Sequence, residues 1–191
     1  MRKVLATLLL TLPLLAAGPK PKVTITTSMG AIQVELEPAA TPKTVDNFLK
    51  YVRKGQYDGT IFHRVKPSGP AMIQGGGHLP DLTKKATDSS IKCEADLAKA
   101  AGLKNVRGTL AMAREDLPDS AKAQFFINVK ANPDLDFQSR TLTGFGYCVF
   151  GKVIKGMDVV DKISKVKTGN QGGMKDVPVK PVVILSVKES N

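Results

Sequence analysis

The segment FHRVKPSGPAMIQGGG, residues 62–77, joins two predicted β-strands through a turn. The strands fall within GTIFHRVKP, residues 59–67, and AMIQGGG, residues 71–77, and each contains a run of apolar side chains. Proline and glycine concentrated between two such runs are typical of a turn. The strands also carry an arginine and a glutamine, so the segment is either ordinary strand and turn or part of a site.

Further strands are predicted on both sides of this segment. Residues 23–38 alternate apolar and polar side chains around an SMG turn, which predicts a β-hairpin. The polar and irregular residues 78–106 are expected to form a loop with short turns. Later strands are expected within VRGTLAMAR, AQFFINVK, GYCVFGKVI and PVVILSV, at residues 106–114, 123–130, 146–154 and 181–187.

Two segments have the period of an α-helix. In TPKTVDNFLKYVRKG, residues 41–55, Thr41 takes the N-cap position, Pro42 begins the helix and Gly55 follows its end. A shorter helix is expected within GMDVVDKISKV, residues 156–166. The apolar face of the first helix is formed by Val45, Phe48, Leu49 and Val52.

These elements predict a mainly β fold. Many short strands with turn signals, and no alternation of strands with helices, favour an antiparallel barrel or sandwich over a parallel sheet. We expect a closed eight-stranded antiparallel β-barrel capped by two α-helices. Side chains fill the interior of a barrel of this size, so a site is expected on its outer surface.

Residues 1–17 have the pattern of a secretory signal peptide. Arg2 and Lys3 precede an uncharged, mainly apolar run, and small residues close the segment. The run is short for a membrane span, which takes about 20 apolar residues, although a short anchor or a buried helix is the alternative. We expect cleavage after Ala17, a lead-in at residues 18–22, one domain at residues 23–191, and export to the periplasm or the medium.

The chain is basic, with a formal net charge of +11 at pH 7. Its lysines are scattered along the sequence, and no set of aromatic residues for stacking on bases accompanies them. A solvated basic surface is therefore favoured over nucleic-acid binding. The sequence contains no GxSxG, P-loop or HExxH motif, so we expect no covalent nucleophile, no cofactor and no metal.

Cys93 and Cys148 are the two cysteines of the chain. An exported protein could join them in a disulfide, although their spacing fits no CxxC redox or zinc motif. The alternative, which we favour, is two free and partly buried thiols. A disulfide needs close Cα atoms, and the sequence does not show them.

Five motifs follow one another along the chain: FHRV at 62–65, AMIQGGG at 71–77, RGTLAMAR at 107–114, AQFFINV at 123–129 and YCVFGKVIKGMDVVDKI at 147–163. In this order they resemble the cyclophilin family of peptidyl-prolyl cis–trans isomerases, and among them the exported bacterial branch. The resemblance covers the whole mature chain. It implies an eight-stranded antiparallel barrel capped by two helices, in agreement with the strand count.

The resemblance also implies a site. Arg64 falls on the family's catalytic arginine, and the backbone N–H of Arg114 would hold a substrate carbonyl. His63, beside the arginine, is expected to be a structural hydrogen-bonding residue rather than a base. The substrate groove is expected to contain Met72, Gln74, Ala113, Arg114, Gln124, Phe126, Leu135 and Tyr147.

Three departures from the family pattern lie near this site. The turn VKPSGPA is longer than usual, and Ala71 replaces a pocket phenylalanine, for which Phe137 or another nearby ring is a candidate substitute. Asp134 stands where tryptophan is frequent, so we expect weak or no binding of cyclosporin-type drugs. Tyr147 stands where histidine is frequent and keeps a ring and a hydroxyl.

Three functions are weighed. The favoured one is a monomeric peptidyl-prolyl isomerase that acts on proline-containing, unfolded or partly folded exported polypeptides, away from the membrane once the signal is cleaved. The second is a binding module that holds proline-containing segments without rotating them quickly. The longer turn and Ala71 suggest this hypothesis. The third is a redox role for Cys93 and Cys148.

Overall fold

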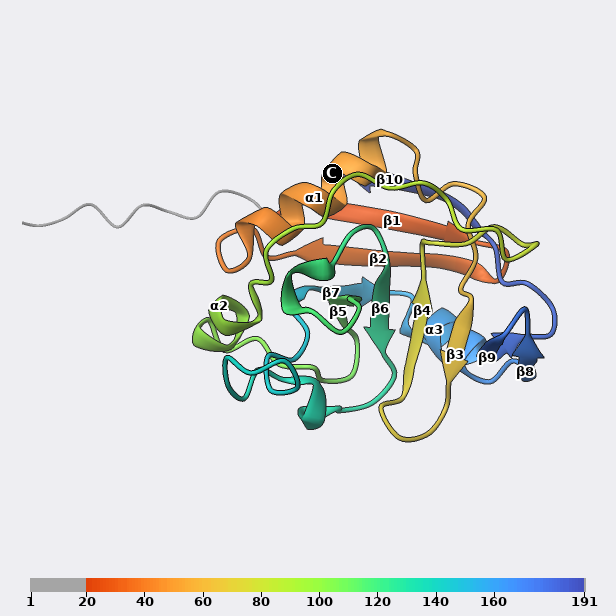
Figure 1. The fold of residues 1–191 in the computed structure, drawn as a ribbon. Helices are drawn as coiled ribbons and strands as arrows, with labels where there is room; N and C mark the ends of the chain where they lie inside the picture. The colour runs from red at the N-terminus through yellow and green to blue at the C-terminus, as the bar shows by residue number, and fades with distance from the viewer. Residues whose placement is uncertain (1–19, 191) are drawn as a thin grey trace, which may run out of the picture.

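The computed structural model describes residues 20–190, which form one large curled sheet with helices packed on it and a small hairpin at its side (Figure 1). The predicted signal peptide, residues 1–17, lies outside the described residues. Between residues 20 and 190, no helix is both long enough and apolar enough to cross a bilayer.

An eight-stranded antiparallel sheet forms the centre of the described chain, and its strands are the eight that the sequence predicts. Their order across the sheet is β10–β1–β2–β7–β5–β6–β4–β3. Each is short and bounded by turns, as expected. The strands are β1 (Lys22–Thr27), β2 (Gly30–Leu36), β3 (Arg64–Lys66), β4 (Met72–Gly75), β5 (Thr109–Met112), β6 (Phe125–Asn128), β7 (Val149–Lys155) and β10 (Ile184–Ser190).

The sheet curls without closing, so the predicted closed barrel is wrong. Its edge strands are β3 and β10. Within residues 20–190 the segments that precede them meet at an isolated bridge, Ile61–Val183, but no continuous ladder joins the two edges. The physical reason is that β3 has only three residues and that an unpredicted hairpin, β8 (Thr168–Gln171) with β9 (Met174–Pro178), lies beside it (Figure 1).

Three α-helices occur among the described residues, one more than the sequence predicts. α1 (Pro42–Arg53) and α3 (Met157–Ser164) are the predicted helices, whereas α2 (Ala95–Ala100) lies in the segment expected to be a loop. With six residues, α2 is too short to show a helical period among its polar neighbours. Two short 3-10 turns complete the fold, at Pro118–Ser120 and Pro133–Leu135.

The N-terminus of α1 is capped by a residue that is distant in sequence. Thr41 takes the predicted N-cap position but makes no side-chain capping bond. Instead the buried Glu94 carboxylate accepts hydrogen bonds from the backbone N–H groups of Lys43 at 3.1 Å and Thr44 at 2.9 Å. A carboxylate is stabilised there because the first N–H groups of a helix lack intrahelical partners and carry the positive end of its dipole.

The main core lies between the inner face of the sheet and helices α1 and α3. Phe48 of α1 places its ring 5.6 Å from that of Phe125 on β6 and 5.1 Å from that of Phe150 on β7. Because successive side chains of a strand point to opposite faces, the neighbours of these core residues lie on the outer face of the sheet. The predicted site residues are among those neighbours.

Candidate active site

Arg64, Gln74 and Phe126 form a row across three adjacent strands on the outer face. Arg64 of β3 is paired with Gln74 of β4, and Gln74 is paired with Phe126 of β6. Residues directly opposite each other in antiparallel strands point to the same face. Val65 and Ile73, the alternate residues, are fully buried in the main core. The pairing of short strands therefore places the arginine beside an amide and an aromatic ring.

A second apolar cluster lies next to this row, separate from the main core. Phe126 is almost fully buried, whereas Met72, Ala113 and Leu135 keep 7–9% of their surface exposed. Tyr147 packs at the rim with its ring 5.5 Å from that of Phe126, at an interplanar angle of 80°. The structure thus brings five of the predicted groove residues together around one apolar surface.

Polar groups border this apolar surface at Gln74, Gln124 and Arg114. The Gln74 Nε2 donates to Gln124 Oε1 at 2.9 Å. The Arg114 guanidinium lies 4.9 Å from the centre of the Tyr147 ring and donates to backbone carbonyls, including that of Gly146 at 2.9 Å. Among the hydrogen bonds of residues 20–190, none uses the Arg114 backbone N–H, which therefore remains available to a ligand.

Arg64 reaches solvent from this row, with 43% of its side chain exposed. Its Nε lies 3.7 Å from the Asp176 carboxylate on the β8–β9 hairpin. A hollow of about 250 Å³ lies between the strands here, lined by His63, Arg64, Met174 and Lys175. Asp176 is thus a neighbour of the predicted catalytic group, although no sequence motif pointed to it.

His63 is buried behind Arg64 and is 5% exposed. Burial, followed by the nearby His78 ring at 4.4 Å, lowers the pKa of His63 to about 4. The ring is therefore neutral at pH 7. Its Nδ1 has no hydrogen-bond partner among the described residues, and the structural hydrogen-bonding role expected for His63 remains a prediction.

A chain of buried asparagines supports the groove from below. Asn132 donates to Asn128 Oδ1 at 2.7 Å and to the Ala71 carbonyl at 3.0 Å. Asn128 donates to Asn105 Oδ1 at 3.2 Å, and Asn105 donates to the Leu135 carbonyl at 3.1 Å. These bonds fix the positions of Ala71 and Leu135. One feature of the sequence could have indicated this network: the polar Asn128 directly follows the apolar run FFI. A buried amide is costly unless it is hydrogen-bonded.

The ring missing at Ala71 is not replaced by Phe137. Phe137 packs against Phe145, with ring centres 5.2 Å apart, in a third cluster around α2. Ala71 itself is buried, and both its backbone groups are hydrogen-bonded to Asn132. The candidate substitution by Phe137 is therefore wrong, and the groove has less aromatic surface at this end.

Cys93 and Cys148 are both free thiols in the structure and share the cluster around α2. Burial raises the pKa of Cys148 to about 12, and burial also raises the pKa of Cys93. Thiols that stay protonated are poor nucleophiles. The arrangement does not support the redox role. Among residues 20–190, no group of three or more His, Cys, Asp or Glu side chains is placed to hold a metal ion.

Comparison with known proteins agrees with this geometry. The sequence model of the family described as cyclophilin type peptidyl-prolyl cis-trans isomerase/CLD matches residues 22–189. The chain is similar to peptidyl-prolyl cis-trans isomerase cyp18 of Streptomyces antibioticus, with 56% identity over 87% of this chain and 96% of that protein. It is also similar to peptidyl-prolyl cis-trans isomerase B of Escherichia coli, with 52% identity over 88% of this chain and 99% of that protein.

Solved structures give the same result at lower sequence identity. A cyclophilin type peptidyl-prolyl cis-trans isomerase of Cryptosporidium parvum superposes with a TM-score of 0.73 at 27% identity, covering 90% of this chain and 98% of that one. A second structure of that protein, in the presence of the dipeptide Ala-Pro, gives a TM-score of 0.72 at 27% identity over 89% of this chain and 99% of that one. The chain belongs to the cyclophilin-type peptidyl-prolyl cis–trans isomerases, an enzyme family.

Proposed function

We propose that this enzyme accelerates rotation about X–Pro bonds by a non-covalent mechanism in which Arg64 donates a hydrogen bond to the prolyl nitrogen. The observation that carries the proposal is the row Arg64–Gln74–Phe126, which places a cationic donor beside an amide and an apolar surface. These three kinds of group match the three parts of an X–Pro unit: the nitrogen, the preceding carbonyl and the ring.

The chemistry requires no bond to break. Resonance between nitrogen and carbonyl sets a barrier of about 18–20 kcal/mol to peptide rotation, and X–Pro bonds exchange in tens to hundreds of seconds without a catalyst. The resonance is lost when the prolyl nitrogen becomes pyramidal, because its lone pair then localises on nitrogen. A guanidinium that donates to this lone pair stabilises the twisted state more than the planar one, which is the condition for catalysis.

The remaining groups would hold the substrate while one side of the bond turns. Met72, Phe126 and Leu135 offer an apolar surface for the proline ring. The Arg114 N–H and the Gln74 amide would fix the flanking carbonyl. A related structure was obtained in the presence of Ala-Pro, which supports a proline-containing ligand for this groove as well.

The rate acceleration that such a mechanism must supply is compatible with this arrangement of groups. A 10⁵-fold acceleration corresponds to about 7 kcal/mol of differential stabilisation. Removal of one preorganised hydrogen-bond donor typically costs 10²–10³-fold in rate, so a charged donor and fixed substrate geometry together approach the requirement. No cofactor or metal takes part in the proposed step.

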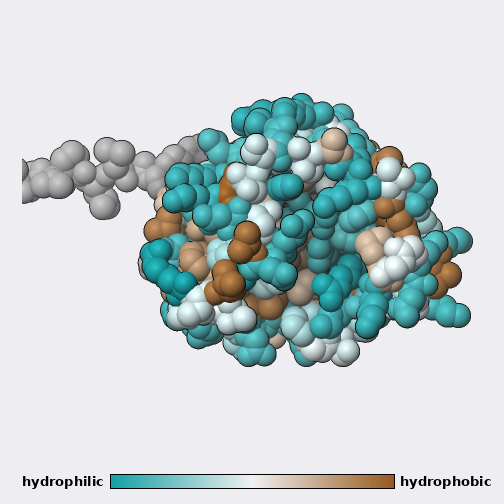
Figure 2. All heavy atoms as spheres, viewed as in Figure 1, coloured by the Kyte–Doolittle hydropathy of each residue, from teal (hydrophilic) through white to brown (hydrophobic). Residues whose placement is uncertain are grey.

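The biological setting belongs to the same proposal. The apolar segment at residues 1–17 supports export to the periplasm or medium, where the enzyme would act as a monomer on unfolded or partly folded polypeptides. Small, separate apolar groups among hydrophilic residues on the face in Figure 2 fit a monomer. Asp134 is exposed beside the groove, which supports the weak binding of cyclosporin-type drugs inferred from the missing tryptophan.

A short X–Pro peptide tests the proposal. The chain without residues 1–17 should raise the cis–trans exchange rate well above background, and Arg64→Ala should lose most of this rate without unfolding. The binding-module hypothesis predicts the opposite pattern for the wild type, namely measurable peptide binding with little acceleration. Absence of acceleration in a folded, peptide-binding wild type would therefore replace the enzymatic account with the binding one.

A further inference from the structure

Two contacts connect the β8–β9 hairpin to the part of the molecule that carries the site. At the first contact, the Asp176 carboxylate of β9 lies 3.7 Å from the Arg64 Nε. At the second contact, the tip of the hairpin lies against Leu82, since a Cβ at Gly172 would be only 2.8 Å from the Leu82 Cδ1. Leu82 is not among the groove residues, and the proposed rotation step gives it no role.

The backbone is strained at both contacts. Among residues 20–190, Leu82 with a φ of 68° and Asp176 with a φ of 60° are the only residues other than glycine whose φ is positive. Aspartate is enriched in this region, whereas leucine seldom adopts it, because its Cβ crowds the following carbonyl oxygen. Strain of this kind persists where the surrounding structure enforces it, often near functional sites. The two strained residues therefore indicate that the position of the hairpin matters.

The loop that carries Leu82 is attached to the strands of the site. It follows β4, and its first residue, His78, forms an isolated antiparallel bridge with Lys84. Inside this bridge, the Leu79 N–H donates to the Thr83 carbonyl at 2.9 Å, and the Leu82 N–H donates to the Leu79 carbonyl at 2.9 Å. Because β4 pairs with β3, the strand of the predicted catalytic arginine, Leu82 and the arginine share one frame.

The hairpin is a short paired unit between its two contacts. Gly172 and Gly173 form its tip with φ values of 56° and 78°, and a type I′ turn requires a positive φ at both central residues. Gln171 pairs with Met174 across this turn, and Asp176 follows Met174 by two residues. A displacement of the tip is therefore expected to move the carboxylate as well.

We propose that Leu82 is a positioning residue for the rotation step: it fixes the tip of the hairpin, so that the Asp176 carboxylate stays beside Arg64 and aims the guanidinium at the prolyl nitrogen. This inference rests on the function proposed above, because Leu82 acts through the Arg64 donor. A hollow of about 250 Å³ lies between the hairpin and Arg64, so close packing alone does not set the distance between them. Without the Leu82 contact, the hairpin would keep its fold but would hold the guanidinium less firmly.

The test measures the cis–trans exchange of a short X–Pro peptide with variants of residue 82. Leu82→Asn removes the apolar contact and should fold normally, because asparagine tolerates a positive φ. It should lower kcat/KM about two- to threefold, within the range of one exposed ion pair. Leu82→Met keeps an apolar side chain and should retain most of the activity. Leu185→Asn, which changes an exposed leucine of β10, is the matched control and should keep the wild-type rate.

The two glycines of the tip provide a second matched pair of variants. Gly172→Ala and Gly173→Ala strain the turn alike, because both glycines have a positive φ. Only the Cβ at residue 172 would meet the Leu82 side chain, whereas a Cβ at residue 173 would have nothing within 4 Å. Gly172→Ala should therefore lower kcat/KM more than Gly173→Ala does, and this difference should vanish in a Leu82→Gly background.

A double-mutant cycle and an NMR signal separate positioning from a general loss of structure. In an Asp176→Asn background, Leu82→Asn should not lower kcat/KM further, because the carboxylate through which it acts is absent. The Nε–H resonance of Arg64 should change in Leu82→Asn and in Asp176→Asn but not in Leu185→Asn. The Kd of the peptide should stay within about twofold of wild type, since Leu82 does not touch the substrate.

Wild-type kcat/KM in Leu82→Asn, or an equal loss with and without the Asp176 carboxylate, would overturn the inference and leave the rotation mechanism intact. A wild type that accelerates no X–Pro peptide would contradict the proposed function instead. In that case the Arg64 resonance still tests the role of Leu82, and a resonance that is unchanged in Leu82→Asn would exclude it.

Discussion

At the scale of single residues, the site depends on which side chains of each strand point outward, because successive side chains alternate between the two faces of the sheet. Arg64 and Gln74 face out, whereas their neighbours Val65 and Ile73 are buried in the core. A shift of one residue in either strand would exchange these roles. The apolar neighbours therefore fix the arginine in the site as firmly as any polar contact does.

Asp176 is expected to position Arg64. It lies at a β-bulge, where Lys175 and Asp176 of β9 face a single residue of β8, and its φ is 60°. Bulges re-aim side chains near active sites, and Asn and Gly tolerate this backbone conformation. Asp176→Asn and Asp176→Gly should therefore fold normally but lower kcat/KM about three- to fivefold, the upper range for an exposed ion pair.

A double-mutant cycle checks that Asp176 acts through Arg64. In an Arg64→Ala background, Asp176→Asn should have no further effect on the residual exchange rate, because the group that it positions is absent. Asp176→Glu, which keeps the carboxylate, should retain more activity than Asp176→Asn. An equal loss in both backgrounds would show that Asp176 affects the site by another route.

His63 is expected to make the folded state sensitive to acid. The unfolded chain binds a proton at this ring as the pH falls below about 6.5, whereas the folded chain does so only near 4. Protonation therefore favours the unfolded state, and stability should fall between pH 6.5 and 4 and be unaffected by this group above that range. The lowering of the His63 pKa from 6.5 to about 4 corresponds to about 3 kcal/mol of folding free energy.

Denaturant unfolding at several pH values, together with NMR titration of the ring, measures this effect. His78, whose pKa is also lowered by burial and by Lys84, contributes in the same direction, so the His63 signal must be assigned separately. A His63 ring that titrates near its ordinary pKa in the folded protein would contradict the expected burial.

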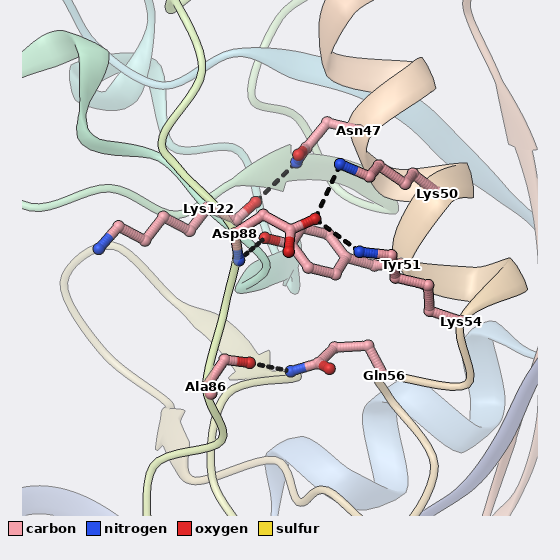
Figure 3. Close-up of polar contacts among 8 residues, drawn as sticks. All are labelled: Asn47, Lys50, Tyr51, Lys54, Gln56, Ala86, Asp88 and Lys122. Carbon is pink, nitrogen blue, oxygen red and sulfur yellow. Dashed lines mark hydrogen bonds and ion pairs between the residues drawn. The ribbon is translucent and has the colours of Figure 1, made fainter.

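At the scale of elements, α1 is connected to the rest of the molecule at both of its ends. Glu94 caps its first turn. Lys50 in its last turn and Lys54, the residue after its end, both bind Asp88 (Figure 3). The segment between Asp88 and Glu94 is therefore tied to one helix from two sides. This explains how a stretch that looked like a polar loop is held in a fixed position against the helix.

Glu94→Ala should destabilise the fold by about 2 kcal/mol, because a cap is lost and buried N–H groups are left without a charged acceptor. Glu94→Gln keeps one acceptor oxygen and should cost less. For a domain of this size, the melting temperature should fall by about 2–4 °C per kcal/mol. Asp116→Ala, which removes an exposed carboxylate, is the matched control, and equal melting temperatures for Glu94→Ala and wild type would exclude the cap.

The elements that sequence patterns predicted and those that they missed differ in length and in partners. The hairpin at residues 23–38 and helix α1 have clear periods because each buries one face on the core. α2 has six residues, and β8 is exposed along most of its length, so neither carries an apolar period. Thr41 does occupy the predicted N-cap position, but the carboxylate that accepts from the first N–H groups of the helix comes from Glu94, a residue far along the chain that a local sequence pattern could not indicate.

At the scale of the whole molecule, the outer-face groove could be predicted, whereas the closure of the sheet could not. Met72, Phe126, Leu135 and Tyr147 come from separate segments, yet their motifs indicated one apolar site and the structure places them together. Closure depends on how the edge strands β3 and β10 end. That is decided by the three-residue length of β3 and by the β8–β9 hairpin, features without a periodic signal.

A hollow beside the groove that is lined by several lysines shows a similar limit of sequence-based prediction. Lys84, Lys85 and Lys122 look like scattered surface lysines in the sequence, yet the fold brings them around one cavity. Asn47 of α1 holds the Lys122 backbone, and the Gly77 carbonyl holds the Lys85 backbone. The net charge of the sequence therefore indicated a basic surface, but it did not indicate that several of the lysines gather beside the groove. Charge focused at a concave site favours an anionic ligand more than the same charge spread over the surface.

The central claim is that the Arg64 guanidinium lowers the barrier to X–Pro rotation, and exchange NMR of a peptide with wild type and Arg64→Lys tests it most directly. One series of spectra gives both kcat and Kd. We expect Arg64→Lys, which keeps the charge but loses the planar donor, to lower kcat by about 10²-fold while Kd changes by less than about threefold. A variant with wild-type kcat and unchanged Kd would contradict the mechanism.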